Sequence, residues 1–299
     1  MRFWLEFLPV WLIAQLLRWL PRPLARLLAR AVAVALYWLH PRLRRVGERN
    51  LQLAFPEKSP AERRKILKGV YLSLGRLLAE VPKFPSYTRE NVDRIAVYDG
   101  LENYVNACNR GKGVLFMTAH LGGWEIGSFV HSLHGYWHNV VVRDLDNPLL
   151  DTWVRRLRTL HGNRTHDKDR YARGLLAAMK RGETVGALMD TNMTPPQGVF
   201  VKYFGVPACT AGGIARVAMR TGAAVLPAFT IWDKELGKYR IRFEPAIPTV
   251  CTGDEEADTV ANTQNYTAAI ERIVRAYPDQ WLWVHRRWKT RPPGEPPLY

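Results

Sequence analysis

Short apolar runs alternate with longer stretches of helical periodicity over most of the chain beyond residue 100. The apolar runs predict strands over 114–117, 139–142, 184–189, 223–230 and 239–243, and helical patterns cover 101–109, 148–160, 170–180, 211–221 and 256–277. Strands that alternate with helices in this way are typical of a mostly parallel sheet covered on both faces. We therefore expect an α/β fold with a mixed, mostly parallel central sheet flanked by helices.

The first forty residues are apolar and rich in tryptophan. Residues 3–20 form an apolar segment at the short limit for a helix that crosses a bilayer. Two prolines follow, and the second apolar helix, over 24–39, has too short an unbroken apolar stretch to cross. Interfacial aromatic residues and many arginines accompany both segments, so we interpret residues 1–40 as an N-terminal helical membrane anchor and residues 41–299 as the domain that it carries. The arginine bias predicts that this domain lies on the cytoplasmic side; a buried helical hairpin is the alternative.

The charge of the chain indicates an anionic partner. There are 43 lysines and arginines against 27 acidic residues, which gives a formal net charge of +16. Nucleic acid, an anionic lipid surface and an acidic protein are the three candidates. A basic cluster near the C-terminus follows alternating tryptophans and consists of Arg286, Arg287, Lys289 and Arg291. It carries no nucleic-acid recognition motif, so we expect no nucleic acid and favour an anionic lipid surface or an acidic carrier protein.

The most informative stretch follows the predicted strand 114–117. His120 falls at the carboxyl edge of the sheet, where open α/β folds bind their ligands. Gly122 and Gly123 allow a tight turn, and Glu125 can accept a hydrogen bond from one imidazole nitrogen, which leaves the other as a base for a hydroxyl. The pattern contains no serine or cysteine nucleophile, which favours direct attack of a substrate hydroxyl on an activated acyl group. A capping histidine paired with a helix-start glutamate is the alternative.

Asp190 ends another apolar strand at the same edge of the sheet. It can orient a basic side chain or bind a substrate headgroup, and a loop-capping role is the alternative. Three histidines, His131, His134 and His138, recur at spacings that a zinc site can use, but no acid lies near them. We therefore expect no metal and no cofactor.

Several motifs in order along the chain resemble the lipid A late acyltransferases, a family of the lysophospholipid acyltransferase superfamily. They are His120-Leu-Gly-Gly-Trp-Glu125, Asp190 with 198–205, 208–210, 281–287 continuing through 291–295, the 49–56 stretch, and Arg143 with Asn147. The resemblance implies a catalytic His–acid dyad, a glycerol-3-phosphate acyltransferase-like fold with a membrane anchor, and acyl transfer from acyl carrier protein or coenzyme A to a lipid hydroxyl. Asp190 is followed by Thr191 where the family usually has glutamine, which leaves the acceptor open.

Together these observations predict an O-acyltransferase of the Gram-negative inner membrane that moves a fatty acyl group from acyl carrier protein to a hydroxyl of a lipid A precursor. We expect His120 and Glu125 to be catalytic. We expect the substrates to be bound by Gly122, Gly123, Arg143, Arg158, Arg164 and Asp190, with the arginines on acceptor phosphates or the phosphopantetheine of the donor. Another lipid acceptor (a phospholipid, a mannosylated lipid or an aminolipid) and acyl-coenzyme A as donor are the alternatives within the enzyme class. A non-catalytic protein that binds anionic lipids is the alternative outside it.

Overall fold

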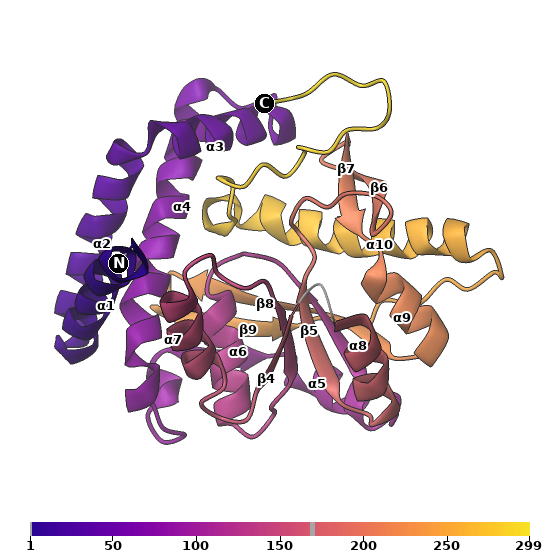
Figure 1. Cartoon of the computed structure of the whole chain (residues 1–299), viewed down its shortest axis with the longest axis horizontal. Helices are drawn as coiled ribbons and strands as arrows, with labels where there is room; N and C mark the ends of the chain where they lie inside the picture. The colour runs from indigo at the N-terminus through magenta and orange to yellow at the C-terminus, as the bar shows by residue number, and fades with distance from the viewer. Residues whose placement is uncertain (1, 168–170) are drawn as a thin grey trace.

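The computed structural model describes residues 2–167 and 171–299. Four helices precede the sheet: α1 (Arg2–Trp19), α2 (Arg22–Leu39), α3 (Pro41–Ala54) and α4 (Pro60–Glu80). They form one side of the molecule, with α2 packed along α4 (Figure 1). Among the described residues, no helix combines the length and the apolar character needed to cross a membrane.

Small residues bring α2 and α4 close together. Ala25, Ala29 and Ala33 are the buried alanines of α2, spaced one turn apart. A Cβ atom at Gly75 of α4 would lie 3.0 Å from the carbonyl oxygen of Ala29, which is tighter than an ordinary contact. The face of α2 that carries these alanines is therefore buried against α4. Other faces of α1 and α2 are exposed to solvent.

The central sheet has seven strands in the order β1-β9-β8-β2-β5-β3-β4. They are β1 (Ala96–Asp99), β2 (Val114–Thr118), β3 (Asn139–Val142), β4 (Arg164–Asp167), β5 (Thr184–Leu188), β8 (Ala224–Asp233) and β9 (Lys238–Phe243). All neighbours pair in parallel except β8 and β9, which are antiparallel. The predicted mixed, mostly parallel sheet is confirmed.

Helices cover both faces of this sheet (Figure 1). They are α5 (Leu101–Cys108), α6 (Trp124–Leu133), α7 (Pro148–Arg158), α8 (Tyr171–Lys180), α9 (Gly213–Thr221) and α10 (Glu255–Ala276). Short 3₁₀ turns cover Val81–Ser86, Val92–Arg94 and Pro278–Gln280. Alternate residues of β2 enter different cores: Leu115 packs in a cluster with Trp281 and α9, and Phe116 in a cluster with α6. This alternation explains the continuous apolar run of β2, because both of its faces are buried.

The sequence pattern missed short elements that lack an apolar run. Arg164–Asp167 contains no apolar run and was not predicted as a strand, yet it pairs with β3 as the edge strand β4. A separate two-stranded hairpin consists of β6 (Gly198–Tyr203) and β7 (Val206–Ala211). The helix expected over 170–180 is described from Tyr171, since Arg170 lies outside the described residues.

The C-terminal tryptophans and Arg287 lie inside the molecule. Trp281, Trp283 and Trp288 are fully buried, and the chain then runs to its end beside α3 (Figure 1). Arg287 is only 1 % exposed and donates hydrogen bonds to the carbonyl oxygens of Thr191 and Cys209. The expectation that this basic cluster forms one surface for an anionic partner is therefore wrong at Arg287, because its guanidinium holds two internal loops together.

Candidate active site

The turn after β2 is fixed in place by the C-terminal segment. The backbone N–H of Gly122 donates to the carbonyl oxygen of Gln280 at 2.9 Å. The backbone N–H of Leu282 donates to the carbonyl oxygen of His120 at 3.0 Å. His120 is thereby held at the carboxyl edge of the sheet by two chain segments that are distant in sequence. This is the position that the sequence predicts for it.

The two glycines of the turn serve close backbone packing. Gly122 has φ +59°, and a Cβ there would lie 2.1 Å from the carbonyl oxygen of Thr230. The N–H of Gly123 donates to that same carbonyl oxygen at 2.8 Å. Both amides are thus engaged inside the protein, which gives the two glycines a packing role, and substrate binding by Gly122 and Gly123 stays a prediction.

Asp190 is the carboxylate that meets the His120 ring. The two residues come together because β2 and β5 are neighbouring parallel strands with Thr118 opposite Leu188, and each residue lies two positions beyond that level. His120 Nδ1 lies 2.9 Å from Asp190 Oδ1, and the backbone N–H of His120 donates to Asp190 Oδ2 at 2.8 Å. The hydrogen bond that we expected between His120 and Glu125 is therefore made by Asp190, which adjacent strands bring within reach.

Asp190 is buried yet remains an acceptor for three N–H donors. The third is the indole Nε1–H of Trp281, which donates to Oδ2 at 2.7 Å. Burial opposes the charged form of this carboxyl, but the charge and hydrogen bonds of His120 outweigh burial and lower the pKa of Asp190 below its usual value. For His120 burial also opposes the charged form, and the Asp190 carboxylate outweighs it and raises the pKa of the imidazole. The pair thus favours an ionised aspartate and a basic histidine.

Glu125 lies on the first turn of α6 and holds Arg158 at the end of α7. The guanidinium donates to the carboxylate through two nitrogens, with Nε to Oε2 at 3.0 Å and Nη2 to Oε1 at 2.5 Å. The third guanidinium nitrogen, Nη1, takes no part in this bidentate pair. Burial lowers the pKa of Arg158 and its contact with Glu125 more than offsets this, so its pKa is raised and it stays charged.

The other two predicted arginines differ in position. Arg143 follows β3 at the same edge of the sheet and is exposed, with its Nη2 3.4 Å from Asp146 Oδ1. Arg164 begins β4 at the opposite, amino edge, where its guanidinium packs over Trp137 and lies 3.5 Å from Glu183. The structure therefore brings Arg143 and Arg158 to the site and leaves Arg164 away from it.

A cavity of about 1090 Å³ is lined by His120, Glu125, Arg158 and Arg143. Most of its wall is apolar and comes from both cores of the protein. Phe116 and Phe243 line it on the α6 side, and Leu175 and Ile214 line it under α8 and α9, among other residues. The space can hold a long apolar chain whose reactive end lies beside His120.

Two buried histidines line the α6 side of this cavity without carrying charge. His138 has its pKa lowered to about 4 by burial, and its Nε2 lies 3.0 Å from the hydroxyl of Ser128. Burial also lowers the pKa of His131, whose Nδ1 lies 3.1 Å from the hydroxyl of Tyr98. At neutral pH both rings are neutral, so they do not oppose an apolar ligand with a buried charge.

Sequence reasoning missed two residues that support the pair. Trp281 and Arg287 were read as parts of a C-terminal motif, yet Trp281 bonds Asp190 directly, and Arg287 binds the carbonyl of the residue that follows Asp190. The sequence does show alternating tryptophans before a basic run. This pattern predicts a buried, extended segment, but it does not predict which strands that segment packs against. Only the fold brings this segment to the ends of β2 and β5.

Comparisons with known proteins all point to one family of acyltransferases. A family model described as bacterial lipid A biosynthesis acyltransferase matches residues 1–290. The chain is 31% identical to the lipid A biosynthesis lauroyltransferase of Escherichia coli K12 and 28% identical to the palmitoleoyltransferase of the same organism, and each alignment covers 100% of this chain and 95% of the relative. It is 26% identical to the lipid A biosynthesis myristoyltransferase of that strain over 82% of this chain and 75% of the relative.

Proposed function

The chain belongs to the bacterial lipid A biosynthesis acyltransferase family and is an O-acyltransferase, and from that premise we propose that it moves a fatty acyl group from acyl carrier protein to a hydroxyl of a lipid A precursor. The single observation that carries the mechanism is the orientation of His120. Its Nδ1 faces the buried Asp190 carboxylate, and the residue lines the long cavity.

His120 is the general base in this proposal. Because Asp190 is ionised, Nδ1 carries the proton that binds it, and Nε2 is left with a lone pair for the acceptor hydroxyl. The hydroxyl oxygen attacks the thioester carbonyl as its proton passes to Nε2. The carbon–sulfur bond then breaks, the proton moves from Nε2 to the departing thiolate, and the products are the ester and the free thiol of the carrier.

Glu125 acts in two ways in this mechanism, and Arg158 is the residue that it positions. The negative charge of Glu125 raises the pKa of His120 and so favours the imidazolium formed during the reaction. Its bidentate contact orients Arg158, whose Nη1 is available to bind the oxygen that becomes negative when the carbonyl is attacked. Arg143, exposed at the same edge, is a candidate for the acceptor phosphate.

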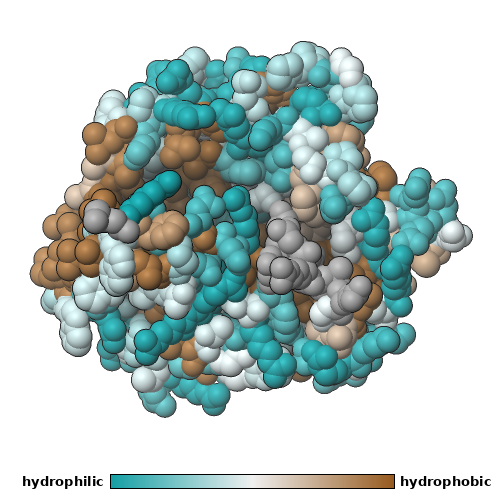
Figure 2. All heavy atoms as spheres, viewed as in Figure 1, coloured by the Kyte–Doolittle hydropathy of each residue, from teal (hydrophilic) through white to brown (hydrophobic). Residues whose placement is uncertain are grey.

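The proposed location is the surface of the inner membrane, with residues 1–40 as an anchor that lies in the interface and residues 41–299 as a catalytic domain on the cytoplasmic side. Figure 2 shows apolar atoms gathered on the side that Figure 1 assigns to α1 and α2. Leu5, Trp19 and Leu39 are 70%, 77% and 72% exposed on these helices. An apolar helical face flanked by arginines is typical of proteins that rest in the membrane interface and bind anionic lipids.

Donor and acceptor are tested by competition in one reaction. The purified protein is given equal amounts of an acyl group on acyl carrier protein and an isotopically labelled one on coenzyme A, with a lipid A precursor and a glycerophospholipid as acceptors. The proposal expects unlabelled ester on the lipid A precursor. Preference for the labelled chain replaces the donor, and ester on the phospholipid replaces the acceptor. Binding to vesicles without any ester supports the non-catalytic alternative instead.

A further inference from the structure

Asn147 joins two helices through one buried side chain. It precedes α7 and is 4% exposed. Its Oδ1 accepts from the backbone N–H groups of Leu149 and Leu150 at 3.0 and 3.3 Å, which caps α7. Its Nδ2 donates to the carbonyl oxygen of Phe3 at 2.9 Å and to Glu6 Oε2 at 3.1 Å, both on α1. This amide thus uses all four of its hydrogen-bonding positions, two on each helix, and α1 and α7 lie side by side in Figure 1.

The start of α7 also fixes the rim of the large cavity. Leu145 and Arg143 are exposed residues that line the cavity, so they form part of its rim. The backbone N–H of Leu145 donates at 3.0 Å to the carboxylate of Asp151, in the first turn of α7. Arg158, which binds Glu125, is the last residue of the same helix, about 15 Å from its start. A shift of α7 therefore moves the rim and Arg158 together.

The first turn of α7 has little else to hold it. Leu157, near the end, is the only buried residue among the eleven of α7, all of which the structure describes. Arg155, also in the second half, donates to the hydroxyl of Thr165 on β4 at 3.0 Å. The first turn contributes no buried side chain, so its anchor is the capping residue Asn147. That residue is in turn anchored to α1.

The first half of α1 is itself weakly held. Ala14 and Leu17 are the buried residues of this helix, and both lie in its second half. Trp4 in the first half is 54% exposed. Pro9 has no backbone N–H, so it interrupts the hydrogen bonds that would join the two halves. A lipid surface that covers the apolar side chains stabilises this first half, and with it the two groups that accept from Asn147.

We propose that Asn147 is a positioning residue that couples the contact of α1 with a lipid surface to the placement of Arg158 and of the cavity rim. On lipid, the carbonyl of Phe3 and the carboxylate of Glu6 stay in place, so Asn147 holds the start of α7. In water the first half of α1 frays, and α7 loses that hold. The coupling rests on the membrane-surface location and on the role of Arg158 proposed above, and it requires no charged headgroup.

The variant Asn147→Asp breaks the link and keeps the helix cap. Aspartate caps helices as well as asparagine does, and its charge is favourable at a helix start. It cannot donate to α1, and its carboxylate lies against that of Glu6. Glu6→Gln alone keeps an oxygen that accepts from Asn147. In Asn147→Asp/Glu6→Gln the glutamine NH₂ donates to the aspartate, so this hydrogen bond returns with donor and acceptor exchanged.

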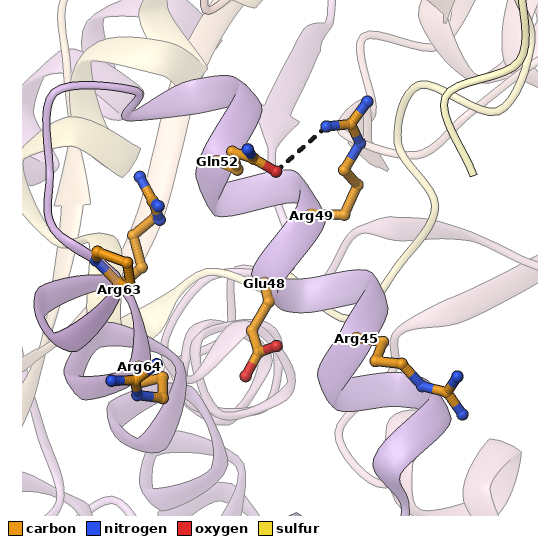
Figure 3. A pocket seen from close by; sticks show the side chains of 7 residues that line it. Arg45, Glu48, Arg49, Gln52, Arg63 and Arg64 are labelled. Atoms are coloured by element: carbon orange, nitrogen blue, oxygen red, sulfur yellow. Dashed lines mark hydrogen bonds between the residues drawn. The ribbon is translucent and has the colours of Figure 1, made fainter.

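Arg64→Gln is the control for charge, because it lowers the net charge by as much as Asn147→Asp does. Arg64 is exposed near the start of α4 and borders a hollow between α3 and α4. Figure 3 shows the guanidinium groups of Arg45 and Arg49, on α3, pointing away from that of Arg64. The hollow therefore has no converging set of charges for this variant to disrupt, and we expect the link between α1 and α7 to stay intact.

The first measurement is amide hydrogen exchange of the whole chain with and without phosphatidylcholine vesicles, in the absence of acyl donor and acceptor. In wild type, Arg64→Gln and the double variant, vesicles are expected to slow exchange over 2–8 and over 143–158. In Asn147→Asp they are expected to slow it over 2–8 alone. An unchanged rate over 143–158 in wild type would overturn the coupling, and this comparison does not depend on the folding of a variant. Slowing over both segments in Asn147→Asp would also overturn it.

Turnover on the same vesicles carrying a lipid A precursor gives the second readout. Asn147→Asp is expected to lower kcat by a factor of about 10 to 100 with the KM of the donor unchanged, because a displacement of about 1 Å in a reacting site has effects of this size. The double variant is expected to recover most of that loss. A double variant as slow as Asn147→Asp would overturn the link. If wild type forms no ester, the proposed function fails, whereas the exchange measurement still decides the coupling.

Discussion

Replacing Asp190 by asparagine is the change that most sharply separates the proposed base from a structural histidine. Two N–H donors, from the His120 backbone and Trp281, converge on Oδ2, and one, from the His120 ring, meets Oδ1. An asparagine oxygen is expected to settle where two donors meet. Its NH₂ group then faces His120 Nδ1 and donates to it, which forces the imidazole proton onto Nε2. The nitrogen that must accept the substrate proton is thereby blocked.

The size of the effect follows from this tautomer change. The same substitution beside the catalytic histidine of a serine protease lowers kcat by about 10⁴, and we expect a loss of about 10³ to 10⁴ here. That loss corresponds to about 4 to 5.5 kcal/mol of transition-state stabilisation. Two charge-assisted hydrogen bonds from His120, at about 1.5 to 3 kcal/mol each, are of the right size to supply it.

The pH profile gives a second readout with a defined sign. Asp190 raises the pKa of His120 above its usual 6.5 against the effect of burial. In the Asp190→Asn variant, burial opposes the charged imidazole more strongly than the remaining negative charge of Glu125 favours it, so the pKa of His120 is expected to fall. The acid limb of kcat/KM is therefore expected to move to lower pH as the plateau drops.

The assay is steady-state ester formation from acyl carrier protein between pH 5 and 9, a range of about four pH units that includes the usual pKa of histidine. Thermal unfolding is measured in parallel. Asp258→Asn is the matched control, because Asp258 is a carboxylate as buried as Asp190, at 3 % exposure, that binds the Thr252–Gly253 turn and does not line the cavity. A plateau within tenfold of wild type, or an acid limb that does not move, would refute Asp190 as the orienting group. A loss of activity in the control of the same size would show that any buried carboxylate has this effect.

Three further changes follow from the contacts of the site. Trp281→Phe removes one N–H donor and keeps most of the packing, so we expect kcat to fall about tenfold with KM unchanged, measured by the same assay; a larger change in KM would contradict a positioning role. Arg158→Lys cannot reproduce the bidentate contact with Glu125, and we expect kcat to fall about 100-fold, whereas wild-type turnover would remove this arginine from the mechanism. Gly122→Ala places a Cβ against a backbone carbonyl at positive φ, so we expect more than about 2 kcal/mol of destabilisation by denaturant unfolding, and an unchanged midpoint would refute the packing role.

Local patterns were enough to predict an α/β fold with a mostly parallel sheet, but not the partner of the imidazole. The apolar runs around Val114–Thr118 and Thr184–Leu188 identify buried strands, and both His120 and Asp190 follow such a run. Which strands become neighbours depends on the packing of the whole chain, and that choice sets Asp190 against His120. Glu125 is nearer to His120 in sequence than Asp190 is, but it lies on α6, and its carboxylate accepts a hydrogen bond from Arg158 instead.

Polar strands and buried charges lay beyond the reach of the sequence pattern for a different reason. The strand Arg164–Asp167 is polar because it lies at the edge of the sheet, and the pairing with β3 is what makes it a strand. Arg287 reads as a surface charge because arginine is rarely buried, yet carbonyl oxygens from two loops satisfy it. Neither property belongs to a local stretch of chain, so each required the assembled fold.

The central claim is that His120 takes the proton of a lipid hydroxyl as an acyl group leaves acyl carrier protein. The most direct measurement is mass spectrometry of a lipid A precursor after incubation with acylated carrier protein and either the wild-type protein or His120→Gln. We predict that the precursor gains the mass of one acyl ester with wild type and none above background with the variant, which has the same fold by circular dichroism. Equal ester formation by the two proteins would contradict the account.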